Sequence, residues 1–398
     1  MAVVNKKTRS VQTLDALAMF GDDEPAPSLQ TMKAPPGGKD ADWYFEPLGF
    51  PPKHPMLWYD DGDLIVVAGD QYTFKIHSEI MKDNSTVLGK VLDGVQPHDV
   101  PDSHRVLVLH DESYRLVDLV MMLYDSDIMK TFFNSNWAVD FDRLLVITPI
   151  AVKYGCQVII AEAIARLEWL FPMSYLRDCL DTSFLFTDVV QPGDLIHRSR
   201  STTVPIAAVA LARAIDAENP PPFIATALYY CTTLPAQTRN RTYTSDKEKI
   251  CLSPADTQLC VVASEALLRR NATVLHPVFH AAEHGSCAST QCHRALQRLA
   301  FELIRRGALT RREVLWPHTD IWKILVECAP GVRPCRQCEW SMIQQIDQRR
   351  YLVFAELGDI FKIANWPARE QARQMLAASS QQTHVARATG PAASTHRR

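Results

Sequence analysis

The sequence lacks the features that would place a chain in a membrane or send it to secretion. No part of its 398 residues approaches about 18 uninterrupted apolar residues, the length that a membrane-spanning helix needs. The first ten residues, MAVVNKKTRS, are polar and basic, and the apolar segment of a signal peptide does not follow them. We therefore expect a soluble intracellular protein, cytoplasmic or nuclear, that has no membrane partner.

An excess of charge of one sign is also missing. The chain has 42 Lys and Arg residues against 45 Asp and Glu residues, so its formal net charge is only −3. Proteins that bind nucleic acid directly usually carry a basic patch, and the basic pairs of this chain have acidic neighbours that cancel them. We therefore expect no direct contact with nucleic acid.

The sequence further lacks the motifs of the common enzyme classes. It has no P-loop, no GxGxxG fingerprint and no GxSxG nucleophile elbow. Gly69 and Gly89 are not spaced to cradle a phosphate, and Gly89 lies inside a helical pattern. We therefore predict no catalytic residue, no cofactor-binding residue and no enzymatic activity.

Composition divides the chain into four parts. Residues 1–55 contain GDDEPAPSLQTMKAPPGGKD and residues 377–398 are similarly polar, so we expect both tails to be mostly disordered. Short β patterns alternate with helical ones over residues 56–171, and nearly every periodic segment over residues 172–376 is helical. The predicted fold class is an α+β unit with a short sheet, followed by a mostly α-helical domain.

The α+β unit opens with a hairpin pattern. Residues 64–67 form a β-branched apolar run, and after a two-residue Gly69-Asp70 turn the apolar residues alternate with polar ones up to Ile76. After His77 the period changes to that of a helix, with Ser85 as an N-cap inside the pattern. A strand at 105–111, a helix at 112–124 and two helices before Phe171 complete the unit.

This order of elements resembles a BTB/POZ domain, in which a short sheet is capped by helical hairpins. The segments WYDDGDLIVVA and FKIH resemble the fungal, basidiomycete-like type, which has an acidic turn before the first strand and Phe-x-x-His before the first helix. We expect His77 itself to be a structural histidine. The positions that carry the resemblance are Trp58, Asp61, Gly62, Asp63, Phe74 and His77.

The resemblance implies a protein-interaction module. It implies a homodimer formed by the first strand region and the helices near residues 80–92, and docking of a cullin-type ubiquitin ligase scaffold on residues 116–129. The alternative is a transcriptional or chromatin regulator that recruits corepressors. The expected interface residues are Ile80, Met81, Val87, Leu88, Val91, Leu92, Leu116, Val120, Leu123 and Tyr124.

Helical patterns continue in the second half at 206–215, 223–231, 257–270 and 341–361. The segments LSPADTQLC, PCRQCEW and RRYLVFAELGDIFKIANW resemble the helical C-terminal region that follows the domain in fungal BTB proteins. This resemblance brings no activity with it. We expect a helical bundle.

Cysteines provide the main chemical feature of this half. Cys287 and Cys292 form one close pair, and Cys335 and Cys338 form a CxxC pair. Two such pairs supply the four thiolates of a structural zinc site, and a chain without a secretory signal is expected to keep its thiols reduced. Free buried thiols and a disulfide are the alternatives.

A rival metal motif lies just upstream. His280, Glu283 and His284 form a literal HxxEH, the signature of a zinc peptidase in which Glu activates water, and Glu356 is a candidate for the third ligand. The surrounding helical patterns lack the substrate-binding sheet of such enzymes. A peptidase is therefore a remote alternative, beside a mixed His and Cys structural site and an ordinary exposed helix face.

Overall fold

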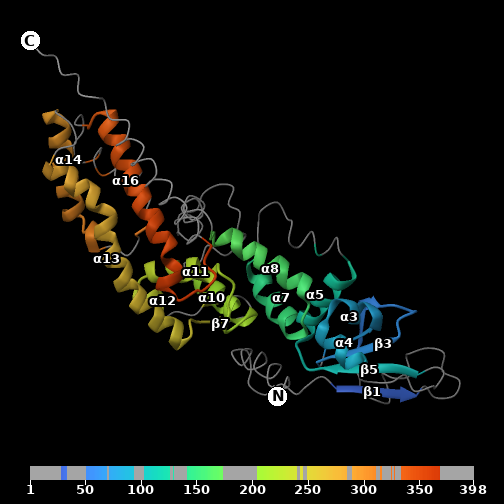
Figure 1. The fold of residues 1–398 in the computed structure, drawn as a ribbon. Helices are drawn as coiled ribbons and strands as arrows, with labels where there is room; N and C mark the ends of the chain where they lie inside the picture. Colours follow the sequence, from blue (N-terminus) through green and yellow to red (C-terminus); the bar gives the residue numbers. More distant parts are fainter. Residues whose placement is uncertain are drawn as a thin grey trace, which may run out of the picture.

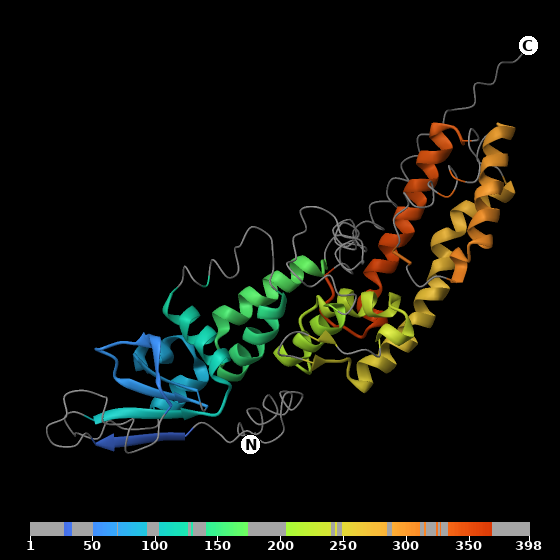
Figure 2. The ribbon, with the colours of Figure 1, turned by 180° about the vertical axis from the view of Figure 1, so that it is seen from behind.

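The structure is a computed structural model, and it describes residues 28–33, 51–69, 71–93, 103–125, 129, 141–173, 204–239, 243–244, 249–284, 289–310, 314–315, 324, 327 and 333–367. A mixed sheet with its helices forms one end of an elongated molecule, and a bundle of long helices forms an arm at the other end (Figures 1 and 2). No helix within the described ranges is both long and apolar enough to span a membrane.

Five strands form the sheet. They are β1 (Ser28–Lys33), β2 (Lys53–Trp58), β3 (Leu64–Ala68), β4 (Tyr72–Ile76) and β5 (Ser103–Leu109), in the order β1-β5-β3-β4-β2. The β3–β4 and β1–β5 pairs are antiparallel, whereas the β3–β5 and β2–β4 pairs are parallel. Central strand β3 is buried along its whole length, which explains its continuous run of apolar residues.

The predicted hairpin is confirmed, with one residue more in its turn. Ala68 pairs with Tyr72, so three residues connect the strands instead of two. Gly69 has a φ of +53°, a conformation that other residues adopt at a cost. The glycine therefore opens the turn as predicted, although the turn is longer than a two-residue one.

Two segments of residues 1–55, which were expected to be mostly disordered, form strands. β1 pairs with β5 at one edge of the sheet, and β2 begins at Lys53 at the opposite edge. Edge strands are held by hydrogen bonds between main-chain groups, so a polar sequence such as SLQTMK can form one without an apolar pattern. The composition of a segment carries no signal of such main-chain pairing.

Helices cover the sheet in the predicted order. They are α3 (Ser78–Asn84), α4 (Thr86–Asp93), α5 (Ser113–Tyr124), α7 (Phe141–Tyr154) and α8 (Gln157–Leu170). Gly155 joins α7 to α8 with a φ of +67°, and a Cβ at this position would lie 2.1 Å from Oγ1 of Thr86. The helical hairpin therefore packs against the start of α4 at a point where only glycine fits.

The second half is mostly helical, as expected. Its elements are α10 (Val204–Ile215), α11 (Ile224–Thr233), α12 (Ala236–Arg239), β6 (Tyr243–Thr244), β7 (Lys249–Ile250), α13 (Pro254–His284), α14 (Thr290–Arg305), η4 (Ala308–Thr310), α16 (Arg336–Ala355) and α17 (Leu357–Ile360). The helix predicted at 257–270 is about twice as long as expected. Helix α14 was not predicted.

The two halves meet in a packed junction near the predicted boundary. Phe171, which ends α8, lies with its ring centroid 6.4 Å from that of Phe223 and 6.2 Å from that of Tyr230. The hydroxyl of Thr226 donates a hydrogen bond to the carbonyl oxygen of Pro172 at 2.8 Å. Buried side chains of both halves belong to one continuous hydrophobic core.

Candidate functional site

The acidic turn before β3, residues 60–63, is hydrogen-bonded to the start of α3. One carboxylate oxygen of Asp63 accepts a hydrogen bond from the Ser78 N–H at 2.7 Å, and the other accepts one from the Ser78 hydroxyl at 2.5 Å. A Cβ on Gly62 would lie 3.0 Å from backbone atoms of Ile76. The first N–H groups of a helix have no hydrogen-bond partner within the helix. The Asp-Gly-Asp sequence positions the Asp63 carboxylate to accept a hydrogen bond from one of them, the N–H of Ser78.

His77 joins this turn to α5. Its Nδ1 lies 2.9 Å from the Tyr124 hydroxyl, and its Nε2 lies 3.2 Å from a carboxylate oxygen of Asp61. Its backbone N–H donates a hydrogen bond to the same hydroxyl at 2.5 Å. The ring of Tyr59 stacks on Tyr124 at 4.8 Å, and burial raises the pKa of Tyr124 to about 12. These contacts give His77 a structural role.

The structure corrects half of the expected interface. Five of the ten residues are buried in the core, because their side chains face the sheet and the other helices: Met81, Leu88, Leu92, Leu116 and Val120. These five cannot contact a partner while the fold is intact. The other five are half-buried, and three of them lie on α3 and α4 and two on α5: Ile80, Val87, Val91, Leu123 and Tyr124.

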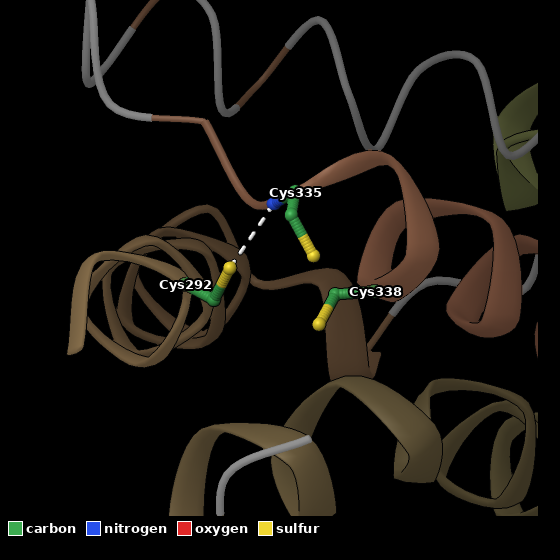
Figure 3. A group of neighbouring side chains, drawn as sticks. All are labelled: Cys292, Cys335 and Cys338. Carbon is green, nitrogen blue, oxygen red and sulfur yellow. Dashed lines mark hydrogen bonds between the residues drawn. The ribbon is translucent and has the colours of Figure 1, made fainter. Parts of the chain in front are cut away.

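Three thiols converge at the distal end of the arm. Cys292 lies in the first turn of α14, and Cys335 and Cys338 lie at the start of α16 (Figures 1 and 3). The three sulfur atoms lie within 4.8 Å of one another. The Cys335 N–H donates a hydrogen bond to Sγ of Cys292 at 3.0 Å. The fold therefore brings a CxxC pair and a cysteine more than forty residues earlier into one cluster, which could hold a metal ion.

The thiols of the cluster differ in exposure. Cys335 is exposed, whereas Cys292 and Cys338 are buried. Hydrogen bonds from the backbone N–H and the thiol of Cys338, and then from the thiol of Cys292, lower the pKa of Cys335 to about 7 from an ordinary value of 9.0. Burial has the opposite effect on two cysteines outside the cluster, Cys156 and Cys260, whose pKa values rise to about 12.

The cluster suits a soft, thiolate-binding ion. Four thiolates around zinc at about 2.3 Å place neighbouring sulfur atoms about 3.8 Å apart, so the three sulfurs need to approach one another by no more than about 1 Å. Thiolates favour zinc or copper(I) over magnesium or calcium. Cys287, the expected fourth ligand, lies outside the described residues. Three of the four predicted ligands are therefore brought together.

The HxxEH motif is not brought together with its expected third ligand. His280 and Glu283 are exposed on α13, and the side chain of His284 lies outside the described part of the chain. Glu356 forms an ion pair with Arg270, which precedes His280 by ten residues, or about 15 Å along the helix. Among described residues, the cysteine cluster is the group of His, Cys, Asp and Glu side chains arranged to hold a metal.

A cavity that sequence reasoning missed lies between α10 and the start of α13. It has a volume of about 390 Å³, and Arg213 and Asp256 line it together with apolar side chains. These two form an ion pair at 2.8 Å, and Ser253 donates a hydrogen bond to Asp256 at 2.8 Å. The S-x-x-D pattern of a helix start marks Asp256 in the sequence, but no pattern marks Arg213. The two charged groups that line the cavity, Arg213 and Asp256, are therefore paired with each other.

No protein-family model, curated protein or solved structure matches this chain. Its function must therefore be inferred from the residues and contacts described above.

Proposed function

We propose that this chain is a protein-interaction scaffold. Its N-terminal α+β unit is of the BTB/POZ type and associates with a second copy or docks another protein, and its helical half positions that partner. A cullin-type ubiquitin ligase scaffold is the docking partner that the resemblance suggests, and a corepressor is the alternative. A reducing intracellular compartment, cytoplasmic or nuclear, is part of this proposal because a structural site made of thiolates requires reduced cysteines.

One observation supports the proposal above the others. The residues that carry the resemblance act together, because Asp61, Asp63 and His77 join the acidic turn to α3 and α5. A hairpin, two helices, a strand and three further helices follow one another as in the proposed domain type. The motif therefore corresponds to a physical unit of the fold.

The proposed self-association surface consists of the half-buried residues of α3 and α4, namely Ile80, Val87 and Val91. Their apolar side chains pack against the core on one side and meet solvent on the other. Leu123 on α5 belongs to the proposed docking surface. Tyr124 is a weaker candidate, because its hydroxyl already contacts His77.

We further propose that the cysteine cluster holds a structural zinc ion. Cys292, Cys335 and Cys338 would supply three thiolates, and Cys287 the fourth, since it precedes Cys292 by five residues. A bound zinc ion supplies a covalent-like link between ligands but no reaction in a closed site. It would tie the start of α14 to the start of α16, at the end of the arm that lies farthest from the sheet (Figure 1).

Light scattering on the full chain tests self-association. The expected mass is about twice the 44.8 kDa of one chain, and it should fall toward one chain in a Val87→Glu/Val91→Glu variant. Val158→Glu, at an exposed position of α8 outside the proposed surface, is the matched control and should stay dimeric. A single-chain mass for the unmodified protein at every concentration would contradict self-association.

Elemental analysis of the same protein tests the metal. About one zinc ion per chain is expected, and both Cys338→Ser and Cys287→Ser should lower that content. Cys251→Ser changes an exposed cysteine outside the cluster and should leave it unchanged. A zinc content that survives Cys338→Ser would place the metal elsewhere.

A further inference from the structure

The three clustered thiols are arranged for oxidation as well as for metal binding. We propose that Cys335 and Cys338 are a peroxide-sensitive dithiol, and that their oxidation to a disulfide releases the zinc ion and frees the start of α16 from α14. This inference rests on the proposed zinc site for the release step, but not for the formation of the disulfide.

The start of α16 gives the pair its geometry. Cys335 is the N-cap of this 20-residue helix and Cys338 is its third residue. Side chains at these two positions lie on the same side of a helix start, which is why they interact in a capping box. A disulfide needs Cα atoms about 4.4–6.8 Å apart, and residues three apart at a helix start meet this requirement.

Exposure decides which sulfur reacts first. Cys335 is exposed, so a peroxide dissolved in water can reach its sulfur, whereas Cys338 and Cys292 are only 4% and 2% exposed. Cys338 is shielded from the oxidant, yet its sulfur lies within 4.8 Å of that of Cys335. One accessible sulfur beside one protected sulfur is the arrangement of a reacting and a resolving cysteine.

The reaction balances with hydrogen peroxide as the oxidant. The Cys335 thiolate attacks one peroxide oxygen, the O–O bond breaks, and a sulfenic acid forms while hydroxide leaves and takes a proton to become water. The Cys338 thiolate then attacks the sulfenic sulfur, the S–S bond forms, and the S–O bond breaks with loss of a second water after protonation. Two thiolates each lose one electron, and peroxide gains two electrons and two protons.

Loss of the metal follows from the ligand count. The disulfide removes two of the four proposed thiolates, and Cys292 and Cys287 alone cannot complete a tetrahedral site. Cys292 is on α14, whereas the new disulfide is contained within α16. A link between two helices is therefore replaced by a link within one helix, which places no constraint on α14.

The test uses the full chain as isolated, treated with about one equivalent of hydrogen peroxide. Zinc release is followed with a chromogenic chelator, and disulfides are assigned by mass spectrometry of proteolytic peptides. We expect a peptide linked through Cys335 and Cys338, release of about one zinc ion per chain, and reversal by dithiothreitol and added zinc. Cys251, which is also exposed but lies outside the cluster, is the internal control and should not appear in the linked peptide.

Variants separate this proposal from its alternatives. In a Cys292→Ser/Cys338→Ser variant, Cys335 should proceed to the sulfinic acid because both neighbouring thiols of the cluster are gone. Zinc-loaded protein in which peroxide leaves the pair unlinked would overturn the dithiol proposal. If the protein is isolated without zinc and still forms the Cys335–Cys338 disulfide, the proposed metal site is contradicted and the dithiol proposal stands.

Discussion

In the sheet unit, polar side chains join segments that lie far apart in the sequence, whereas in the arm three long helices meet largely through apolar side chains. The hydroxyl of Ser113 donates to the carbonyl oxygen of Ala68, and that of Ser85 donates to the carbonyl oxygen of Tyr154, both at 2.6 Å. Asp111 is buried and forms an ion pair with Lys153 at 2.6 Å.

The arm is organised differently along its length. Its polar links across helices include Asn271, which donates to the carbonyl oxygen of Ala308, and Arg350, which donates to that of Leu315. At the distal end the helices are joined by the hydrogen bond from Cys335 to Cys292. The comparison teaches that several polar contacts cross-link the sheet unit, whereas packed apolar side chains and the hydrogen bond from Cys335 to Cys292 join the helices at the end of the arm. We therefore expect the arm to open locally before the sheet unit does.

The largest expected effect is the destabilisation of the arm by a substitution that leaves the sheet unit unchanged. Leu299→Ala removes a fully buried side chain of α14 and should lower the free energy of unfolding by about 3.5 kcal/mol. Hydrogen exchange measured by mass spectrometry should show faster exchange in α13, α14 and α16, with unchanged protection in β3 and β5. Arg298→Ala, at an exposed position of the same helix, is the control. Equal loss of protection in the sheet would show that the regions unfold together.

A second substitution loosens the sheet unit instead. Gly155→Ala places a Cβ 2.1 Å from Oγ1 of Thr86 on a backbone with φ of +67°, so we expect a loss of about 3 kcal/mol in unfolding experiments with denaturant. The double variant Thr86→Ala/Gly155→Ala relieves the contact but not the backbone strain. It should recover about half of the loss, and no recovery would contradict the close packing of the α7–α8 turn on α4.

A smaller effect is expected at the acidic turn. Burial raises the pKa of Asp63, but hydrogen bonds from the hydroxyl and N–H of Ser78 outweigh it, so the pKa lies below its ordinary value of 3.8. The carboxylate therefore stabilises the fold above pH 3.8, and this contribution disappears as the pH falls through the lowered folded value. Asp63→Asn should cost about 1.5 kcal/mol at pH 7. The difference from the unmodified protein should vanish in acid, and a constant difference at all pH values would contradict the assignment.

The last prediction concerns the reactivity of individual thiols and involves no change in stability. In metal-free protein, alkylation of Cys335 by iodoacetamide should rise with pH around a midpoint of about 7, because hydrogen bonds lower its pKa to about 7. Cys156 and Cys260 are buried, and their pKa values are raised to about 12, so they should react only after unfolding. Residue-resolved mass spectrometry measures all three. A midpoint near 9 for Cys335 would show that its sulfur lacks these hydrogen bonds.

The sequence predicts the sheet unit better than its edges. The hairpin and the helices from α3 to α8 follow from apolar periods of two and 3.6 residues, because their side chains are sorted between core and solvent. Strand β1 has no such pattern, since main-chain pairing with β5 holds it. Five residues of the expected interface are buried in the core, because periodicity identifies an apolar face without telling whether the protein's own core already covers it.

The cysteine cluster is predictable in part. The spacings of Cys287 with Cys292 and of Cys335 with Cys338 suggest two pairs of ligands, and the structure adds that Cys292 on α14 lies beside the pair on α16. Spacing alone does not show which thiol is exposed, because that depends on how α14 and α16 pack at the end of the arm. The HxxEH motif illustrates the opposite case, since Glu356 pairs with Arg270 and so leaves the motif without its expected third ligand.

Helix α13 has a mechanical consequence for anything bound at the end of the arm. Its 31 residues span about 46 Å, so it acts as a lever that runs from the junction with α11 to the thiols. With this length as the radius, a rotation of about 10° at the base of the helix moves its far end by about 8 Å. A small adjustment where Phe171 meets Phe223 would therefore move the cysteine cluster at the far end by more than the width of a side chain.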